Sequence, residues 1–141
     1  IVNRQKGVFI MKDVIFDNFQ ESVNHSLLRH RSILDILTKY SESNARVNRA
    51  IAKAVTSCGC IKINASKQQM SEDDSIDNLC NCLNSHVEGE ICDNCREVIE
   101  REMGNNLFYL TSLCNALDIS LYDILLKEND KIDTLGKFTF R

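Results

Sequence analysis

The stretch that decides the fold is Cys92–Leu126, which reads CDNCREVIEREMGNNLFYLTSLCNALDISLYDILL. Apolar side chains recur in it every three or four positions, at Ile99, Met103, Leu107, Leu110, Cys114 and Leu117. At about 100° per residue these positions fall within about 80° of one another, so the spacing predicts an amphipathic helix with one apolar face. We expect a turn at Asp118 and Ile119, followed by a helix that begins with a capping box at Ser120 and Asp123.

The rest of the chain also has a helical pattern. It contains no proline and only five glycines, and strand patterns are nearly absent. We expect a first helix over residues 12–39 and a second that is capped at Ser41 or Ser43 and fades near Lys67. A loop follows, and then a short helix over residues 76–84. The predicted fold class is therefore all-α, a bundle of four main helices.

Length and charge narrow the range of functions. The chain has 141 residues and a fresh helical pattern begins after Met11, so we expect residues 1–10 to be an N-terminal extension and residues 11–141 a single domain. The formal net charge of −3 gives no indication of a nucleic-acid partner. No apolar run reaches the ~20 residues that cross a bilayer, and no secretory signal is recognisable. The sequence predicts a cytoplasmic protein with no membrane partner, whose apolar seams are covered in a homodimer.

Seven cysteines without an export signal favour reduced thiols, metal ligands or core residues over disulfides. Cys92 and Cys95 lie three apart at a predicted helix start, so both sulfurs point to one side, where amide donors and the helix dipole lower thiol pKa. His86 precedes them and completes a three-ligand cluster for zinc or another soft metal. Cys58 or Cys60 is the expected fourth ligand.

The alternative for some of these cysteines is simple core packing. Residues two apart in a helix point about 200° away from each other, so Cys58 and Cys60 can bind one ion only if Gly59 breaks the helix. Cys58 also falls on the apolar seam of the second predicted helix. We therefore interpret it, like Cys114, as a small buried hydrophobic residue.

Acidic side chains on the predicted long helix form a second candidate site. Glu97 and Glu100 share a helix face, and Glu102 flanks the apolar seam. Carboxylate oxygens suit a hard cation such as magnesium when several converge. The alternative is a solvated helix face, which we favour for Glu97; a charge beside the seam, as at Glu102, must either extend to solvent or serve a function.

Residues 101–126, REMGNNLFYLTSLCNALDISLYDILL, resemble the MazG-like all-helical nucleoside triphosphate pyrophosphohydrolases, whose third helix typically reads E-E-L-G-D-V-L-F-Y-L. The matching positions are Gly104, Leu107, Phe108, Tyr109 and Leu110, together with the turn at 117–121. The resemblance implies a helical bundle that holds magnesium with an E-x-x-E motif on an earlier helix and an E-x-x-D motif on this one. It also implies attack of water on a metal-bound nucleoside triphosphate, with release of pyrophosphate.

Under this resemblance, Glu102 takes the glutamate position of E-x-x-D and Asn105 stands at the aspartate position, with Glu97 or Glu100 in support. The chain has no acid between Glu42 and Glu72, where the E-x-x-E pair is expected. The first functional hypothesis is a nucleotide pyrophosphohydrolase relative with altered activity that uses magnesium.

Two alternatives stand beside this hypothesis. One is a non-catalytic helical protein with a cysteine-ligated structural or sensory zinc, which acts through partner binding. The other is a structural dimer without metal.

Overall fold

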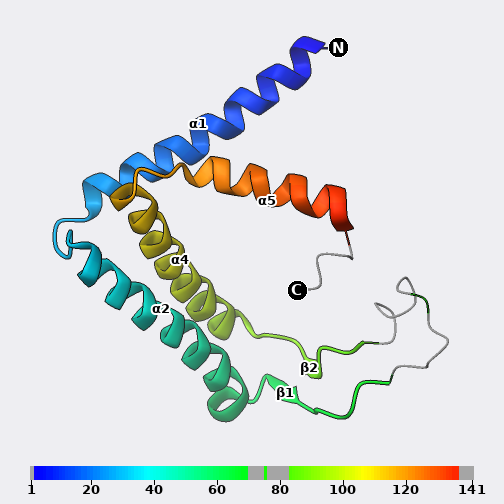
Figure 1. Ribbon diagram of the computed structural model, residues 1–141. Helices are drawn as coiled ribbons and strands as arrows, with labels where there is room; N and C mark the ends of the chain where they lie inside the picture. The colour runs from blue at the N-terminus through cyan, green and yellow to red at the C-terminus, as the bar shows by residue number, and fades with distance from the viewer. Residues whose placement is uncertain (1, 70–74, 76–82, 137–141) are drawn as a thin grey trace. The chain divides into compact units, whose positions relative to one another are not determined.

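The structure is a computed structural model, and it describes residues 2–69, 75 and 83–136, with side chains from residue 14 onward (Figure 1). Its elements, in chain order, are α1 (Val2–Ser26), α2 (Ile33–Lys53), the π-helical turn η1 (Ala54–Cys58), β1 (Ile61–Ile63), β2 (Val87–Gly89), α4 (Asp93–Ala116) and α5 (Leu121–Leu135). The described chain is mostly helical, as the sequence predicted. None of these helices has an apolar stretch long enough to cross a lipid bilayer.

Contacts divide the chain into two compact units. Unit 1 comprises residues 1–44 and 104–141, and unit 2 comprises residues 45–103. α2 and α4 contribute one part of their length to each unit. α1 begins at Val2 and continues through Met11, and the expected extension over residues 1–10 and single domain over residues 11–141 stay predictions.

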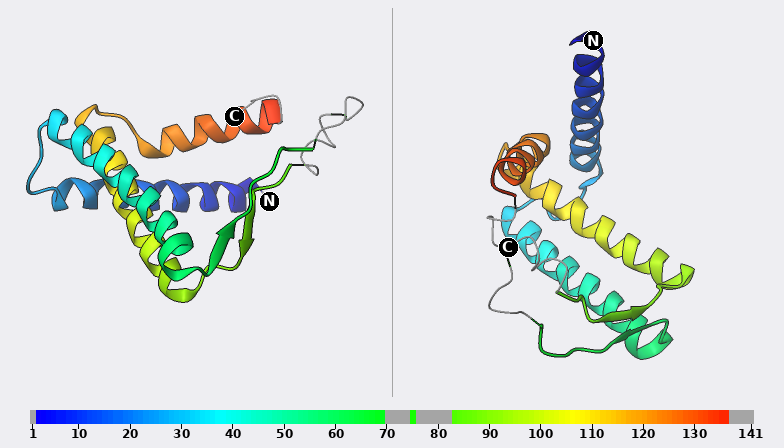
Figure 2. Two further views of the ribbon diagram at one scale, coloured as in Figure 1. Left: turned by 90° about the horizontal axis from the view of Figure 1, so that it is seen from below. Right: turned by 90° about the vertical axis from the view of Figure 1, so that its right-hand side faces the viewer.

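Unit 1 is built around the contact of α1 with the start of α5 (Figure 1 and Figure 2). The rings of Phe16 and Tyr122 lie 5.8 Å apart between centroids, and Val23 is buried on α1. The Gln20 side chain joins the two helices through the backbone: its amide nitrogen donates to the Ile119 carbonyl at 2.7 Å, and its amide oxygen accepts from the Leu121 N–H at 3.0 Å. One side chain on α1 therefore holds the beginning of α5.

The turn and cap between α4 and α5 agree with the sequence prediction. Asp118 takes a left-handed conformation with φ +53°, and the Ile119 N–H donates to the Cys114 carbonyl at 2.8 Å. The Ser120 hydroxyl accepts from the Asp123 N–H at 3.2 Å, which satisfies a free amide in the first turn of α5.

The predicted single helix over residues 12–39 is wrong. α1 ends at Ser26, and α2 begins at Ile33 after a short connection in which His30 has a φ of +53°. An L-residue in that conformation ends a right-handed helix. The apolar spacing does not reveal the break, because Leu27 continues the pattern. Leu27 is buried although it lies outside both helices.

Unit 2 has a small apolar core of Ala50, Ala54, Ile61 and Ile99. α2 does not continue to Lys67 as predicted; η1 ends at Cys58, and β1 then pairs with β2 in antiparallel register, Ile61 opposite Gly89 (Figure 2). Strands of three residues are too short for alternation to be recognised in the sequence. The predicted short helix over residues 76–84 lies mostly outside the described residues.

Candidate metal centre

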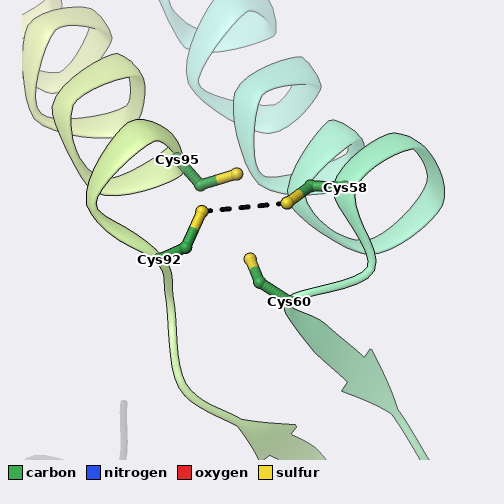
Figure 3. A group of neighbouring side chains, drawn as sticks. All are labelled: Cys58, Cys60, Cys92 and Cys95. Carbon is green, nitrogen blue, oxygen red and sulfur yellow. Dashed lines mark hydrogen bonds between the residues drawn. The ribbon is translucent and has the colours of Figure 1, made fainter.

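Four cysteine sulfurs come together in unit 2. Cys58, Cys60, Cys92 and Cys95 each offer one sulfur, and all four sulfurs lie within 4.8 Å of one another (Figure 3). Cys58 ends η1 and Cys60 precedes β1, whereas Cys92 precedes α4 and Cys95 lies in its first turn. Two short segments that are far apart in the sequence therefore each supply two sulfurs to one point.

One of the distances between the sulfurs is close to the edge of a tetrahedral zinc site. Zinc–sulfur bonds of about 2.3 Å in a tetrahedron place neighbouring sulfurs about 3.8 Å apart. The Cys58 and Cys92 sulfurs are 3.7 Å apart. Four cysteine sulfurs this close together could hold a metal ion such as zinc.

Gly59 allows Cys58 and Cys60 to face the same point. It adopts a left-handed conformation with φ +74°, and its N–H donates to the Ala54 carbonyl at 2.9 Å, which ends the helix. The sequence analysis required such a break for both sulfurs to bind one ion, and the structure contains it. The preferred reading of Cys58 as a buried hydrophobic residue is wrong, because Cys58 is exposed; Cys114, by contrast, is buried as expected.

Gly89 sets the approach of the second segment. A Cβ built at this position would lie 2.7 Å from the Cys60 carbonyl oxygen, and the residue has a φ of +89°. Only glycine fits both the space and the conformation. Sequence analysis did not connect Gly89 with the cysteines. The available signal is its position, three residues before the first cysteine of Cys92-x2-Cys95.

The sulfurs share negative charge unequally. The pKa of Cys92 is lowered to about 7, chiefly because the backbone N–H of Cys95 donates to its sulfur, and the thiols of Cys95 and Cys58 add to this effect. The pKa of Cys95 is raised to about 12, chiefly by its thiol hydrogen bond to Cys92. The same partner raises the pKa of Cys58. The Cys92 thiolate is thus stabilised by neighbouring hydrogen-bond donors. A soft cation bound to the four sulfurs would replace the thiol protons in that role.

His86 is not part of this group, so the expected cluster of His86, Cys92 and Cys95 is corrected to four cysteines. The His86 ring nitrogens lie 3.4 Å from the Ser66 backbone nitrogen and 2.9 Å from the Gln68 side-chain nitrogen. These contacts hold the histidine beside the chain that leaves β1. The two sulfurs that lie beside Cys92 and Cys95 belong instead to the cysteines that flank Gly59.

The acidic residues predicted to bind magnesium are placed separately. Within the described residues, the four cysteines form a group of potential ligands, whereas Glu97, Glu100 and Glu102 do not. Glu100 and Asn105 are exposed on α4. The carboxylates of the resemblance therefore do not make a magnesium site by themselves.

Glu102 nevertheless has an unusual environment. Its side chain is 13% exposed, and its Oε2 is buried without a hydrogen-bond partner among the described residues. Its other oxygen, Oε1, lies 3.9 Å from the Arg101 Nε. Glu102 lines an open pocket of about 460 Å³ whose other residues are Arg46, Arg49, Ala50, Lys53 and Val98.

No protein-family model, curated protein or solved structure matches this chain. Function is therefore inferred from the geometry of unit 2.

Proposed function

We propose that Cys58, Cys60, Cys92 and Cys95 bind one zinc ion, and that this ion is a structural or sensory centre in a non-catalytic helical protein that acts through a partner. The observation that carries the proposal is the convergence of the four sulfurs within 4.8 Å of one another. Four thiolates fill the tetrahedral coordination of zinc and leave no position for water or substrate. Such a closed site stabilises a fold or senses its own loss of metal, but it does not hydrolyse a substrate.

Thiolates also favour zinc over harder cations. Four sulfur ligands in a tetrahedron are typical of zinc or iron, whereas magnesium and calcium prefer oxygen. We choose zinc because closed four-cysteine sites without redox chemistry are typical of structural zinc, and the 3.7 Å between the Cys58 and Cys92 sulfurs is compatible with its tetrahedral edge.

The zinc ion would fasten the segment at η1 and β1 to the segment at β2 and α4. Cys60 and Cys95 also pack against the small core of Ala50, Ala54, Ile61 and Ile99. A core of that size gives unit 2 little apolar burial of its own, and metal binding adds to folding free energy when the site exists only in the folded state. The ion and the core would therefore stabilise the same part of the chain.

Metal content tests this proposal. Protein purified without chelator is expected to hold one zinc per chain by elemental analysis, and Cys58→Ser or Cys92→Ser is expected to lose most of it. Cys114→Ala is the matched control, since it removes a thiol that lies outside the group. Zinc-free wild-type protein that does not take up zinc, or equal zinc loss in the control, would contradict the proposal.

A second candidate function is supported by Glu102. The resemblance proposes a MazG-like bundle related to nucleotide pyrophosphohydrolases, and the unpartnered Glu102 carboxylate lies at the position of a family metal ligand. Among the described residues, the acids that would complete a magnesium site do not come together, so altered or absent turnover is expected. Pyrophosphate release from a panel of nucleoside triphosphates with magnesium tests it: activity that Glu102→Gln abolishes and Glu21→Gln leaves intact would favour this candidate over the first.

We also propose that the protein is a cytoplasmic homodimer. Free thiols persist in a reducing compartment, and α5 exposes apolar side chains at Ile124, Leu125 and Ile132, each between 43% and 50% exposed. A second copy of the chain would cover them. Light scattering at micromolar concentration is expected to give twice the chain mass, and a monomer at that concentration would contradict this proposal.

A further inference from the structure

Three of the six residues that line the open pocket beside Glu102 have cationic side chains. Arg46, Arg49 and Lys53 lie three and four positions apart, so they share one face of α2. Glu102 on α4 is the one acid among the residues that line it. Arg49 and Lys53 alone outnumber this acid, so the lining carries an excess of positive charge, which attracts an anion and opposes a free metal cation.

The shape of the pocket suits a small molecule. Its volume of about 460 Å³ lies within the range of small-ligand sites, and Ala50, Val98 and the aliphatic parts of the basic side chains form its walls. Arginine guanidinium groups bind phosphate oxygens through paired N–H donors, and lysine adds a point charge. Phosphate is the anion that this combination recognises best.

Glu102 adds a second requirement for the ligand. Its side chain lines the pocket and is 13% exposed, and its Oε2 has no hydrogen-bond partner among the described residues. A small turn of the carboxyl group would present this acceptor to a donor group of a ligand. A carboxylate accepts hydrogen bonds from hydroxyl or amino groups but repels phosphate. The ligand should therefore carry a phosphate at one end and a donor group elsewhere.

An adjoining pocket provides room for the remainder of such a molecule. It shares Ala50, Lys53 and Val98 with the first pocket and continues along α2 and α4 to Cys58 and Cys95. The ligand is therefore not confined to the size of a phosphate ion.

We propose that the pocket lined by Arg46, Arg49, Lys53 and Glu102 binds a small phosphorylated molecule bearing a hydroxyl or amino group, and binds it without a metal ion. This proposal does not depend on zinc at the cysteine centre. It also contrasts with the nucleotide-hydrolase candidate, in which Glu102 would hold magnesium and phosphate would bind through the metal.

Calorimetric titration of the zinc-loaded protein in magnesium-free buffer tests the proposal. Adenosine monophosphate is the probe, and adenosine is its uncharged counterpart. We expect adenosine monophosphate to bind at least about tenfold more tightly than adenosine, with an affinity that magnesium leaves unchanged within about twofold. The double variant Arg49→Gln/Lys53→Gln should weaken binding by about tenfold or more, because two charge-assisted contacts are lost.

A matched double variant separates the pocket from general charge. Arg29→Gln/Lys127→Gln removes the same charge from exposed positions that do not line the pocket and should bind as the wild type does. Equal weakening in both double variants would overturn the proposal. Tighter binding of an oligonucleotide than of adenosine monophosphate, weakened equally by the two double variants, would also overturn the proposal. That result would indicate a nucleic-acid surface.

Glu102→Gln distinguishes this proposal from the magnesium candidate. Loss of the carboxylate should leave the affinity for inorganic pyrophosphate unchanged or higher, because a negative charge near the phosphates is removed. The ratio of the affinity for adenosine monophosphate to that for pyrophosphate should fall, because the acceptor for a hydroxyl or amino group is lost. Binding of either probe that requires magnesium and is abolished by Glu102→Gln would overturn metal-free recognition. Absence of binding to both probes at millimolar concentration would overturn the pocket itself.

Discussion

Two glycines make the four-cysteine group possible, each for a different physical reason. Gly59 has open space around it and is needed for its φ of +74°, which turns the chain so that Cys58 and Cys60 face one point. Gly89 is needed for both its conformation and its lack of a side chain, since a Cβ would meet the Cys60 carbonyl oxygen at 2.7 Å. The four-cysteine group thus depends on two residues that contribute no sulfur to it.

Gly89→Ala is expected to lower the free energy of unfolding by about 1–3 kcal/mol, because the new methyl group must displace the Cys60 backbone while the backbone keeps a strained positive φ. Zinc affinity should fall with it. Denaturant unfolding and competition with a chelator measure the two effects.

Gly104→Ala is the matched control. Gly104 is exposed within α4, and a Cβ there meets nothing within 4 Å. Alanine has a higher helix propensity than glycine, so the free energy of unfolding of this variant should rise by about 0.5–1 kcal/mol and its zinc affinity should stay the same. A Gly89→Ala protein as stable and as zinc-avid as the wild type would show that β2 does not need its close approach to β1.

In metal-free protein, Cys92 should be the first of the described cysteines to react with iodoacetamide. The thiolate is the reactive form, and the pKa of Cys92 is lowered to about 7 from an ordinary value of 9.0. The reaction rate should therefore be near its plateau at pH 8 and fall as the pH drops through about 7. The stabilisation that the Cys92 thiolate gives the metal-free fold should be fully present only above the ordinary thiol pKa of 9.0 and should be lost as the pH falls from there to about 7.

Peptide mapping after short labelling at several pH values measures this order of reaction. Zinc should protect Cys92 at every pH at which it stays bound, and Cys114, whose pKa is raised by burial, should react slowly with or without zinc. Labelling of Cys95 ahead of Cys92 would contradict the assignment of the thiolate.

The sequence predicted part of this site. Cys92 and Cys95 were identified as ligands because their spacing alone places both sulfurs on one side of a helix start. The sequence did not determine which of His86, Cys58 and Cys60 lies beside Cys92 and Cys95. That depends on the β1–β2 register, which brings distant segments together, and three-residue strands give no local sequence signal. The interpretation of Cys58 as a core residue was wrong for a different reason. It assumed that the helical periodicity continues through Gly59.

At the scale of elements, the helices were predictable where caps and apolar spacing agree. α4 and α5 were recognised from apolar spacing, a turn and a serine cap. The apolar face predicted for α4 is only partly buried, since Met103, Leu107 and Leu117 are exposed. The break between α1 and α2 was missed because no proline or glycine marks it. A signal was available in Ser32-x-x-Asp35, a pattern that often starts a helix, and the Ile36 N–H donates to the Ser32 carbonyl at 3.0 Å.

The contact of α1 with α5 gives a prediction at this scale. Gln20→Ala should lower the free energy of unfolding by about 1–2 kcal/mol, because the Ile119 carbonyl and the Leu121 N–H both lose their side-chain partner. Urea denaturation followed by circular dichroism measures the change. Glu21→Ala, on the neighbouring exposed position, should change stability by less than about 0.5 kcal/mol, and equal effects of the two substitutions would argue against the bridging role of Gln20.

At the scale of the whole molecule, the chain contains two compact units of different character. Unit 1 joins helices through rings, buried apolar side chains and the Gln20 bridge, whereas unit 2 combines a small core with the four-cysteine group. The proposed zinc ion therefore stabilises one unit directly and not the other.

Removal of zinc with a chelator should raise amide hydrogen exchange most in residues 45–69 and 83–103, since metal binding and folding are linked there. Residues 14–26 and 121–135 should keep most of their protection. Hydrogen exchange with mass spectrometry measures both regions in one sample. Protection lost equally along the chain, or unchanged everywhere, would contradict a role for the metal within unit 2.

The β1–β2 pairing also suggests a way to recognise this centre in other chains. All four ligands and both required glycines fall within two short blocks, Cys58-Gly59-Cys60 and Gly89-x2-Cys92-x2-Cys95. The entropy cost of joining the two blocks grows only slowly with the number of residues between them, so that number can vary during evolution while the blocks stay fixed. A genome search for C-G-C followed at variable distance by G-x2-C-x2-C would therefore retrieve candidates for the same centre even where the helices have diverged beyond recognition.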